Sequence, residues 1–192
     1  TTGDDNVAMG YGALGANTTG STNIAIGNNA MLVSTTAARS TVVGFNAGNA
    51  MTSGGDNCIF GYEAGGAVTT GIENTILGYY AGAATTTSDY NTFVGSGAGQ
   101  ANTTGAANTT IGAAAGDALT TGSNNTIAGR DAGGVLNTGT NNLLLGHDSG
   151  LSGSPGGALT NDANKIVLGD ENILEAHIKV DWTVASDQRD KT

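Results

Sequence analysis

Short apolar runs recur along the chain, and each run ends at a glycine, here called the marker glycine. The clearest copy reads Asn-Thr-Ile-Leu-Gly from Asn74 to Gly78 and continues to the pair Thr86-Thr87. The marker glycine recurs at every seventeenth position without an insertion, at Gly10, Gly27, Gly44, Gly61, Gly78, Gly95, Gly112, Gly129 and Gly146. A period this strict indicates a solenoid, in which each coil stacks on the one before it.

Each position of the repeat forms a column along the solenoid, and two columns indicate the interior. The position immediately before the marker glycine is apolar in every copy, from Met9 to Leu145, so we expect it to point inward. The third position after the glycine is alanine in eight copies, from Ala13 to Ala132, and Ser149 in the ninth. Only a crowded interior requires a side chain this small this regularly.

Strands are expected rather than helices, because frequent glycine and β-branched threonine both disfavour helical turns. We predict two short strands per coil, of three to five residues each, at the Asn-Thr-x-apolar and the Ala-x-Thr-Thr stretches. Stacked coils should then carry ladders of Asn over Asn and Thr over Thr. The fold class is therefore all-β, a parallel β-solenoid in which one coil corresponds to one copy of the repeat.

The period sets the expected organisation of the chain. Residues 1–150 form the nine-copy repeat, residues 151–163 an irregular insertion that contains Pro155, residues 164–185 capping strands, and residues 186–192 a polar ending. A tenth half-repeat, from Ile166 to Gly169, brings its glycine at the twenty-third position after Gly146 instead of the seventeenth.

A second column of the strand is also largely apolar. It lies two positions before the marker glycine and includes Val42, Ile76 and Leu144. Because successive side chains of a strand point to opposite faces, a second face of the solenoid should be apolar as well. We infer a homo-oligomer that buries this face, and a trimer around the long axis is the favoured closed arrangement.

Composition narrows the range of partners and chemistry. The net charge is −10, which argues against nucleic acid or an anionic membrane surface, and no apolar run approaches the roughly 20 residues of a membrane span. Glu63 and Glu73 are the only glutamates of the repeats and occupy unlike columns, so the paired carboxylates of a glycosidase are not indicated. His147 and His177 stand isolated in the sequence, and no calcium-binding motif occurs, so neither a metal nor another cofactor is expected.

The aromatic residues and the single cysteine also occupy fixed positions of the repeat. Aromatic residues follow the marker glycine in four copies, Tyr11, Phe45, Tyr62 and Tyr79. Such a column offers a surface for stacking against a glycan, and the alternative, which we favour, is that the rings cover the corner and pack on each other between coils. The single cysteine, Cys58, shares a column with Val7 and Ile24 and is expected to be a packed thiol.

The Asn-x-Ala-apolar-Gly segments at Asn6–Gly10 and Asn23–Gly27 resemble the head domains of trimeric autotransporter adhesins. That resemblance covers residues 1–150. It implies three chains, each wound as a left-handed parallel β-roll and packed side by side. The coils of that family are usually shorter than the repeat found here, which leaves the cross-section of this roll open.

The end of the chain resembles the junction that precedes the intramolecular chaperone domain of bacteriophage tail fibres and tailspikes. That junction reads Ser-Asp-x-Arg-x-Lys, which Ser186, Asp187, Arg189 and Lys191 match position by position, and Trp182 lies on a predicted strand shortly before it. The resemblance implies a single self-cleavage, with Ser186 as nucleophile and Lys191 as general base. The chaperone domain itself would lie beyond Thr192.

Together these features predict a structural and receptor-binding segment of an extracellular trimeric fibre, most simply a phage tail fibre or tailspike in the virion. Its expected receptor is a glycan or protein on a bacterial surface. The alternative is a trimeric adhesin on a bacterial cell surface. A third hypothesis is ice binding through threonine ladders, which is disfavoured because adjacent threonines of a strand point to opposite faces.

Overall fold

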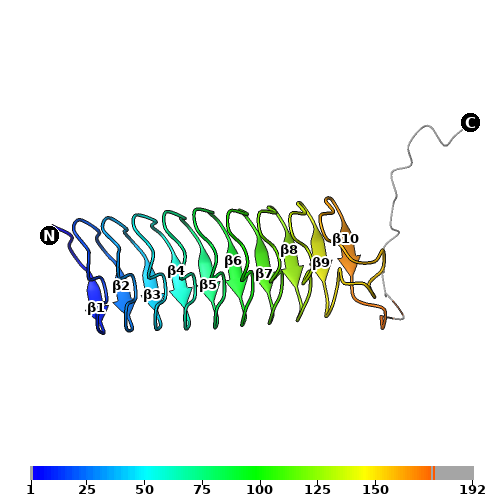
Figure 1. Cartoon of the computed structure of the whole chain (residues 1–192), viewed down its shortest axis with the longest axis horizontal. Coiled ribbons are helices and arrows are strands. Elements are labelled where there is room, and N and C mark those ends of the chain that lie inside the picture. Colours follow the sequence, from blue (N-terminus) through cyan, green and yellow to red (C-terminus); the bar gives the residue numbers. More distant parts are fainter. Residues whose placement is uncertain (1, 174, 176–192) are drawn as a thin grey trace, which may run out of the picture.

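The computed structural model describes residues 2–173 and Glu175 and shows one elongated solenoid (Figure 1). Ten strands of three residues form a single parallel sheet in chain order, and the described residues contain no helix. The strands are β1 (Val7–Met9), β2 (Ile24–Ile26), β3 (Thr41–Val43), β4 (Cys58–Phe60), β5 (Thr75–Leu77), β6 (Thr92–Val94), β7 (Thr109–Ile111), β8 (Thr126–Ala128), β9 (Leu143–Leu145) and β10 (Ile166–Leu168). The predicted all-β solenoid, with coils of about 17 residues, is confirmed.

The period fixes the register of the sheet. Ile59 pairs with Ile76 on the next strand, and each residue of β1 to β8 pairs with its equivalent one repeat further on. The last interval is longer, since Leu144 of β9 pairs with Val167 of β10. The extra residues lie between Gly150 and Leu159, whose N–H donates to the Gly150 carbonyl at 2.9 Å. The chain therefore loops out after Gly150 and rejoins the stack at Leu159, within the predicted insertion.

Each coil holds one strand, so the prediction of two strands per coil is wrong. The Thr pairs lie in bends between strands instead. There the first threonine of a pair bonds to the equivalent residue of the next coil, as when the Thr69 hydroxyl donates to the Thr86 carbonyl at 3.1 Å and the Thr69 N–H does so at 2.8 Å. The predicted threonine ladder is present, but the threonine hydroxyls join the coils there instead of a second sheet.

The strands also face the opposite way from our expectation. The middle residue of each strand points into the solenoid, and Val42, Ile76 and Phe93 are fully buried. The position before the marker glycine, predicted to be inward, is instead half-buried or exposed, for example at Leu77 and Ile111. Both columns are apolar, so hydrophobicity alone did not distinguish the inner face from the outer one.

The interior is filled by three columns. The middle residues of the strands pack with the alanine column, whose members from Ala30 to Ala132 are completely buried, as predicted. A third column, seven positions after the marker glycine, closes the core with Met51, Val68 and Leu119. Its identity varies between apolar and polar residues, which is why the sequence pattern did not reveal it.

A buried asparagine ladder joins the coils at the start of the strands. The Asn74 Oδ1 accepts hydrogen bonds from the Asn91 backbone N–H at 3.0 Å and from the Asn91 Nδ2 at 3.2 Å. The Asn74 Nδ2 donates in turn to the Ser88 carbonyl at 2.9 Å. The same pattern repeats from Asn108 to Asn142, and Ser40 replaces asparagine in one coil. Each side chain thereby satisfies a backbone donor that would otherwise be buried without a partner.

The marker glycine is required by both conformation and space. At Gly78 the φ angle is 142°, which side chains rarely adopt, and a Cβ would lie 2.3 Å from the Gly95 carbonyl oxygen. The next marker glycine thus stacks directly on the backbone of the one before. This close approach turns each strand sharply and places the residue after the glycine at the surface.

Candidate functional site

The outer face of the sheet carries two columns of uncharged side chains along the whole solenoid. The first and third residues of the ten strands form it, five of them threonine and the rest apolar. Met9 and Ile111 on this face are 63% and 46% exposed. Large exposed apolar patches are uncommon on monomeric soluble proteins, so this face is a candidate interaction surface. Cys58 lies on this face and is half-buried in the single chain, rather than packed inside it as we expected.

The aromatic column forms a stack at the corner that follows the sheet. The rings of Phe45 and Tyr62 lie 5.1 Å apart and 8° from parallel, and those of Tyr62 and Tyr79 lie 5.4 Å apart at 21°. Tyr80 adds an edge-on contact to Tyr79 at 4.6 Å. The favoured prediction, that these rings pack on each other between coils, is confirmed for this group. Tyr11 stands outside the stack, 81% exposed.

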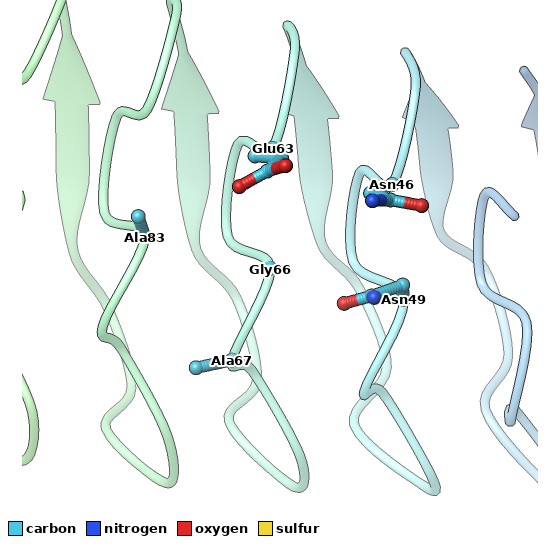
Figure 2. A pocket seen from close by; sticks show the side chains of 6 residues that line it. All are labelled: Asn46, Asn49, Glu63, Gly66, Ala67 and Ala83. Atoms are coloured by element: carbon cyan, nitrogen blue, oxygen red, sulfur yellow. The ribbon is translucent and has the colours of Figure 1, made fainter. Parts of the chain in front are cut away.

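A polar pocket adjoins the stack. It has a volume of about 220 Å³ and is lined by Asn46, Asn49, Glu63, Gly66, Ala67 and Ala83 (Figure 2). Asn46, Asn49 and Glu63 supply its polar side chains. The small residues Gly66 and Ala83 occupy a column that holds Asn49 one coil earlier and Gln100 one coil later, and this step in size creates the hollow.

Glu63 links the pocket with the aromatic stack. Its carboxylate raises the pKa of Tyr80 to about 12, chiefly because the neutral Tyr80 phenol donates a hydrogen bond to it. Partial burial raises the pKa of Tyr62, and the Glu63 charge adds to that effect. Glu63 takes part in none of the ion pairs found among the described residues. Glu63 therefore lies between the aromatic rings and the amide groups with no cationic partner among the described residues.

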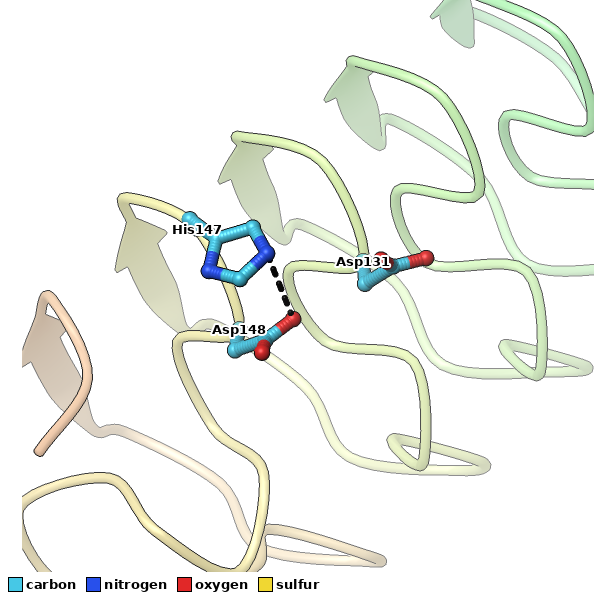
Figure 3. A group of neighbouring side chains, drawn as sticks. All are labelled: Asp131, His147 and Asp148. Carbon is cyan, nitrogen blue, oxygen red and sulfur yellow. Dashed lines mark ion pairs between the residues drawn. The ribbon is translucent and has the colours of Figure 1, made fainter.

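A cluster of charged groups surrounds His147, which we expected to be isolated. The ligand atoms of Asp131, His147 and Asp148 lie within 4.8 Å of one another (Figure 3). His147 also lies 3.4 Å from the Asp170 carboxylate, and the Arg130 guanidinium contacts both His147 and Asp131, the latter at 2.5 Å. Stacking brings together residues that belong to successive coils. Arg130 supplies a cation among these carboxylates.

The predicted cleavage site is not among the residues that the structure describes. Ser186, Asp187, Arg189 and Lys191 lie outside the described residues, as do His177 and Trp182. Glu63 and Glu73 are described and lie on different columns, as the sequence indicated. A further hollow of about 410 Å³, between Asn124 and Ile166, has no aromatic residue in its lining.

Among the described residues no helix is long and apolar enough to cross a membrane. Comparison with protein-family models, with curated proteins and with solved structures gave no match for this chain.

Proposed function

We propose that this chain is a structural and receptor-binding segment of an extracellular trimeric fibre, most simply a phage tail fibre or tailspike. The observation that carries the proposal is the outer sheet face, which presents two uncharged columns over ten strands. A single chain leaves this face in water, whereas three parallel chains bury it around a common axis. Cyclic symmetry closes such an assembly and keeps the three solenoids pointing in one direction.

The interior of the coil supports a role as a rigid spacer. Every coil is joined to the next by backbone hydrogen bonds, and most coils also by an asparagine ladder and a threonine hydroxyl. Each step thus combines directional bonds with apolar packing, so the solenoid resists both bending and sliding. Rigidity of this kind holds a binding surface at a fixed distance from an anchor.

The ending of the chain supports the phage assignment through its resemblance to the chaperone junction. In that assignment the Ser186 hydroxyl attacks a backbone carbonyl at the junction once, while Lys191 takes up its proton. The peptide C–N bond then breaks, and water releases the acyl group from Ser186. A bacterial trimeric adhesin is the second candidate, because the repeat resembles the head domains of that class. Replacing Ser186 by alanine in the chain extended past Thr192 separates the two. If the extended chain with Ser186 yields a cleaved product and the alanine variant does not, the phage fibre is supported. If both chains remain one uncleaved species, self-cleavage is excluded.

A charge on the outer sheet face tests the assembly. Leu77 lies on this face at 36% exposure, and Leu77→Lys would place three ammonium groups near the axis. We expect this variant to remain folded by circular dichroism and to lose the oligomer in size-exclusion chromatography. Thr104→Lys is the matched control, because Thr104 is exposed on another part of the coil. If the two variants elute identically, the sheet face is not the interface.

A further inference from the structure

We infer that Asp131, His147 and Asp148 bind a zinc ion at the C-terminal end of the regular repeat. Asp131 reaches this cluster from the coil of β8, whereas His147 and Asp148 come from the coil of β9 (Figure 3). An imidazole nitrogen and carboxylate oxygens are ligands that zinc accepts in proteins. The inference goes beyond the proposed fibre function and does not depend on it, because all three residues belong to one chain.

The contacts of the His147 ring leave its Nε2 as the ligand atom. On one side, His147 Nδ1 lies 3.4 Å from the Asp170 Oδ2. On the other side, the Arg130 Nη2 contacts the His147 Nε2. A guanidinium can only donate, so Nε2 accepts and the ring proton is on Nδ1, where it faces Asp170. A histidine that binds a metal is held in the same way, because its other N–H is donated to a carboxylate.

The Arg130 guanidinium marks the place where the cluster holds a cation. Its Nη2 contacts the His147 Nε2 and its Nη1 lies 2.5 Å from the Asp131 Oδ2, so one cation joins two of the three ligand atoms. The Asp148 Oδ1 lies 3.3 Å from the same Nε2, and there two acceptors face each other. A metal ion in place of the guanidinium gives both acceptors a shared partner. The Arg130 side chain is 62% exposed and can turn out into the solvent.

Charge and distances suit a divalent ion. Asp131, Asp148 and Asp170 surround one arginine, so two negative charges remain uncompensated when the imidazole is neutral. Zinc binds these atoms at about 2.0–2.2 Å, which places tetrahedral ligands roughly 3.4 Å apart. The ligand atoms now lie within 4.8 Å of one another, so the widest pair has to approach by up to roughly 1.4 Å. The three side chains are between 35% and 46% exposed, so this movement leaves the core unchanged.

Such an ion would brace the end of the solenoid. Asp131 follows β8, His147 follows β9 and Asp170 follows β10, the strand that comes after the insertion. The ion and the Asp170 contact therefore join three successive coils at the point where the regular spacing of about 17 residues is interrupted. A ligand that binds the folded chain and not the unfolded one stabilises the fold. We expect zinc to raise the melting temperature of the unmodified chain and not that of His147→Ala.

Calorimetric titration of zinc chloride into the full chain, first freed of metal by a chelator, tests the inference. We expect one zinc ion per chain. His147→Ala should weaken zinc binding by at least about tenfold, the lower bound seen when even an outer partner of a metal ligand is replaced. Arg130→Ala should tighten zinc binding, because the competing cation is removed. Circular dichroism in the presence of chelator shows that each variant is folded before it is titrated.

Asp56→Asn is the matched control, because Asp56 forms a carboxylate–arginine pair with Arg39 between coils near β4. It should leave the zinc affinity unchanged. Calcium takes about six to eight oxygen ligands and should bind more weakly than zinc. The inference is overturned if the unmodified chain binds no zinc, if calcium binds more tightly, or if Arg130→Ala weakens binding. It is also overturned if zinc binding survives His147→Ala and is lost instead on replacing His177, which lies outside the described residues.

Discussion

Replacing Asn91 by alanine would interrupt the buried asparagine ladder in the middle of the solenoid. Asn91 is fully buried, and its Oδ1 accepts from the Asn108 backbone N–H at 3.0 Å and from the Asn108 Nδ2 at 3.3 Å. Its Nδ2 donates to the Asn74 Oδ1 and to the Ser88 Oγ, at 3.2 and 3.1 Å. Asn91→Ala removes all four bonds and leaves the Asn108 backbone N–H without its acceptor.

The expected loss of stability follows from the Asn108 N–H that is left without an acceptor. A buried donor without a partner costs about 1–3 kcal/mol, and each lost hydrogen bond adds about 0.5–1.5 kcal/mol. The orphaned N–H and the three other lost bonds together span about 2.5–7.5 kcal/mol. Because the Asn108 Nδ2 keeps its bond to the Gly122 carbonyl, we expect a loss at the low end of that range, about 3 kcal/mol. For a chain of this size, that loss lowers the melting temperature by roughly 6–12 °C.

Thermal melts followed by circular dichroism measure this effect, and Asn91→Ser provides a graded comparison. Serine already stands in this column at Ser40, where its Oγ accepts the Asn57 N–H at 3.2 Å. Asn91→Ser should therefore retain the acceptor and lose about half as much stability as Asn91→Ala. If alanine and serine melt at the same temperature as the unmodified chain, the ladder does not stabilise the coils and this reasoning fails.

Three further predictions concern Ala98, Tyr80 and Cys58. Ala98→Leu overpacks the fully buried alanine column and should cost about 1–3 kcal/mol per chain in thermal melts, whereas exposed Thr104→Ser should be nearly silent; equal melting temperatures would contradict the interior position of Ala98. In a spectrophotometric titration, Tyr80 should ionise with a pKa of about 12, so the stability it contributes is complete below pH 10 and is lost as the pH rises through 12; Glu63→Gln should lower that pKa, and no change would exclude the contact. The Cys58 thiol, on the outer sheet face, should react slowly with a thiol reagent in the native protein and rapidly after unfolding, and rapid native reaction would place this face in water.

The regularity of the sequence predicted the period, the coil length and the alanine column, because an interior without spare volume permits a single residue type. It did not predict which strand face is buried, since Ile76 and Leu77 are both apolar although they point to opposite faces. The second predicted strand failed for another reason. β-branched Thr pairs favour strands, but here the threonine hydroxyl bonds to the next coil and the backbone bends.

The surface sites depended on stacking between coils. The sequence showed Phe45, Tyr62 and Tyr79 at equal intervals, which was sufficient to predict that their rings meet. It did not show that Tyr80 and Glu63 would join them. Both residues take positive φ angles, 53° and 52°, which could not be predicted from the sequence. The sequence did not show that His147 meets Asp131 and Asp170, because these residues belong to the coils before and after it and only stacking brings them together.

The central claim is that three chains bury the outer sheet face around one axis. Sedimentation equilibrium of the unmodified 192-residue chain tests it most directly, because the molar mass is obtained without reference to shape. One chain has a mass of 18.8 kDa, so the account predicts a single species of about 56 kDa that persists on dilution. A single species of 18.8 kDa would contradict it, because the uncharged face would then be stable in water.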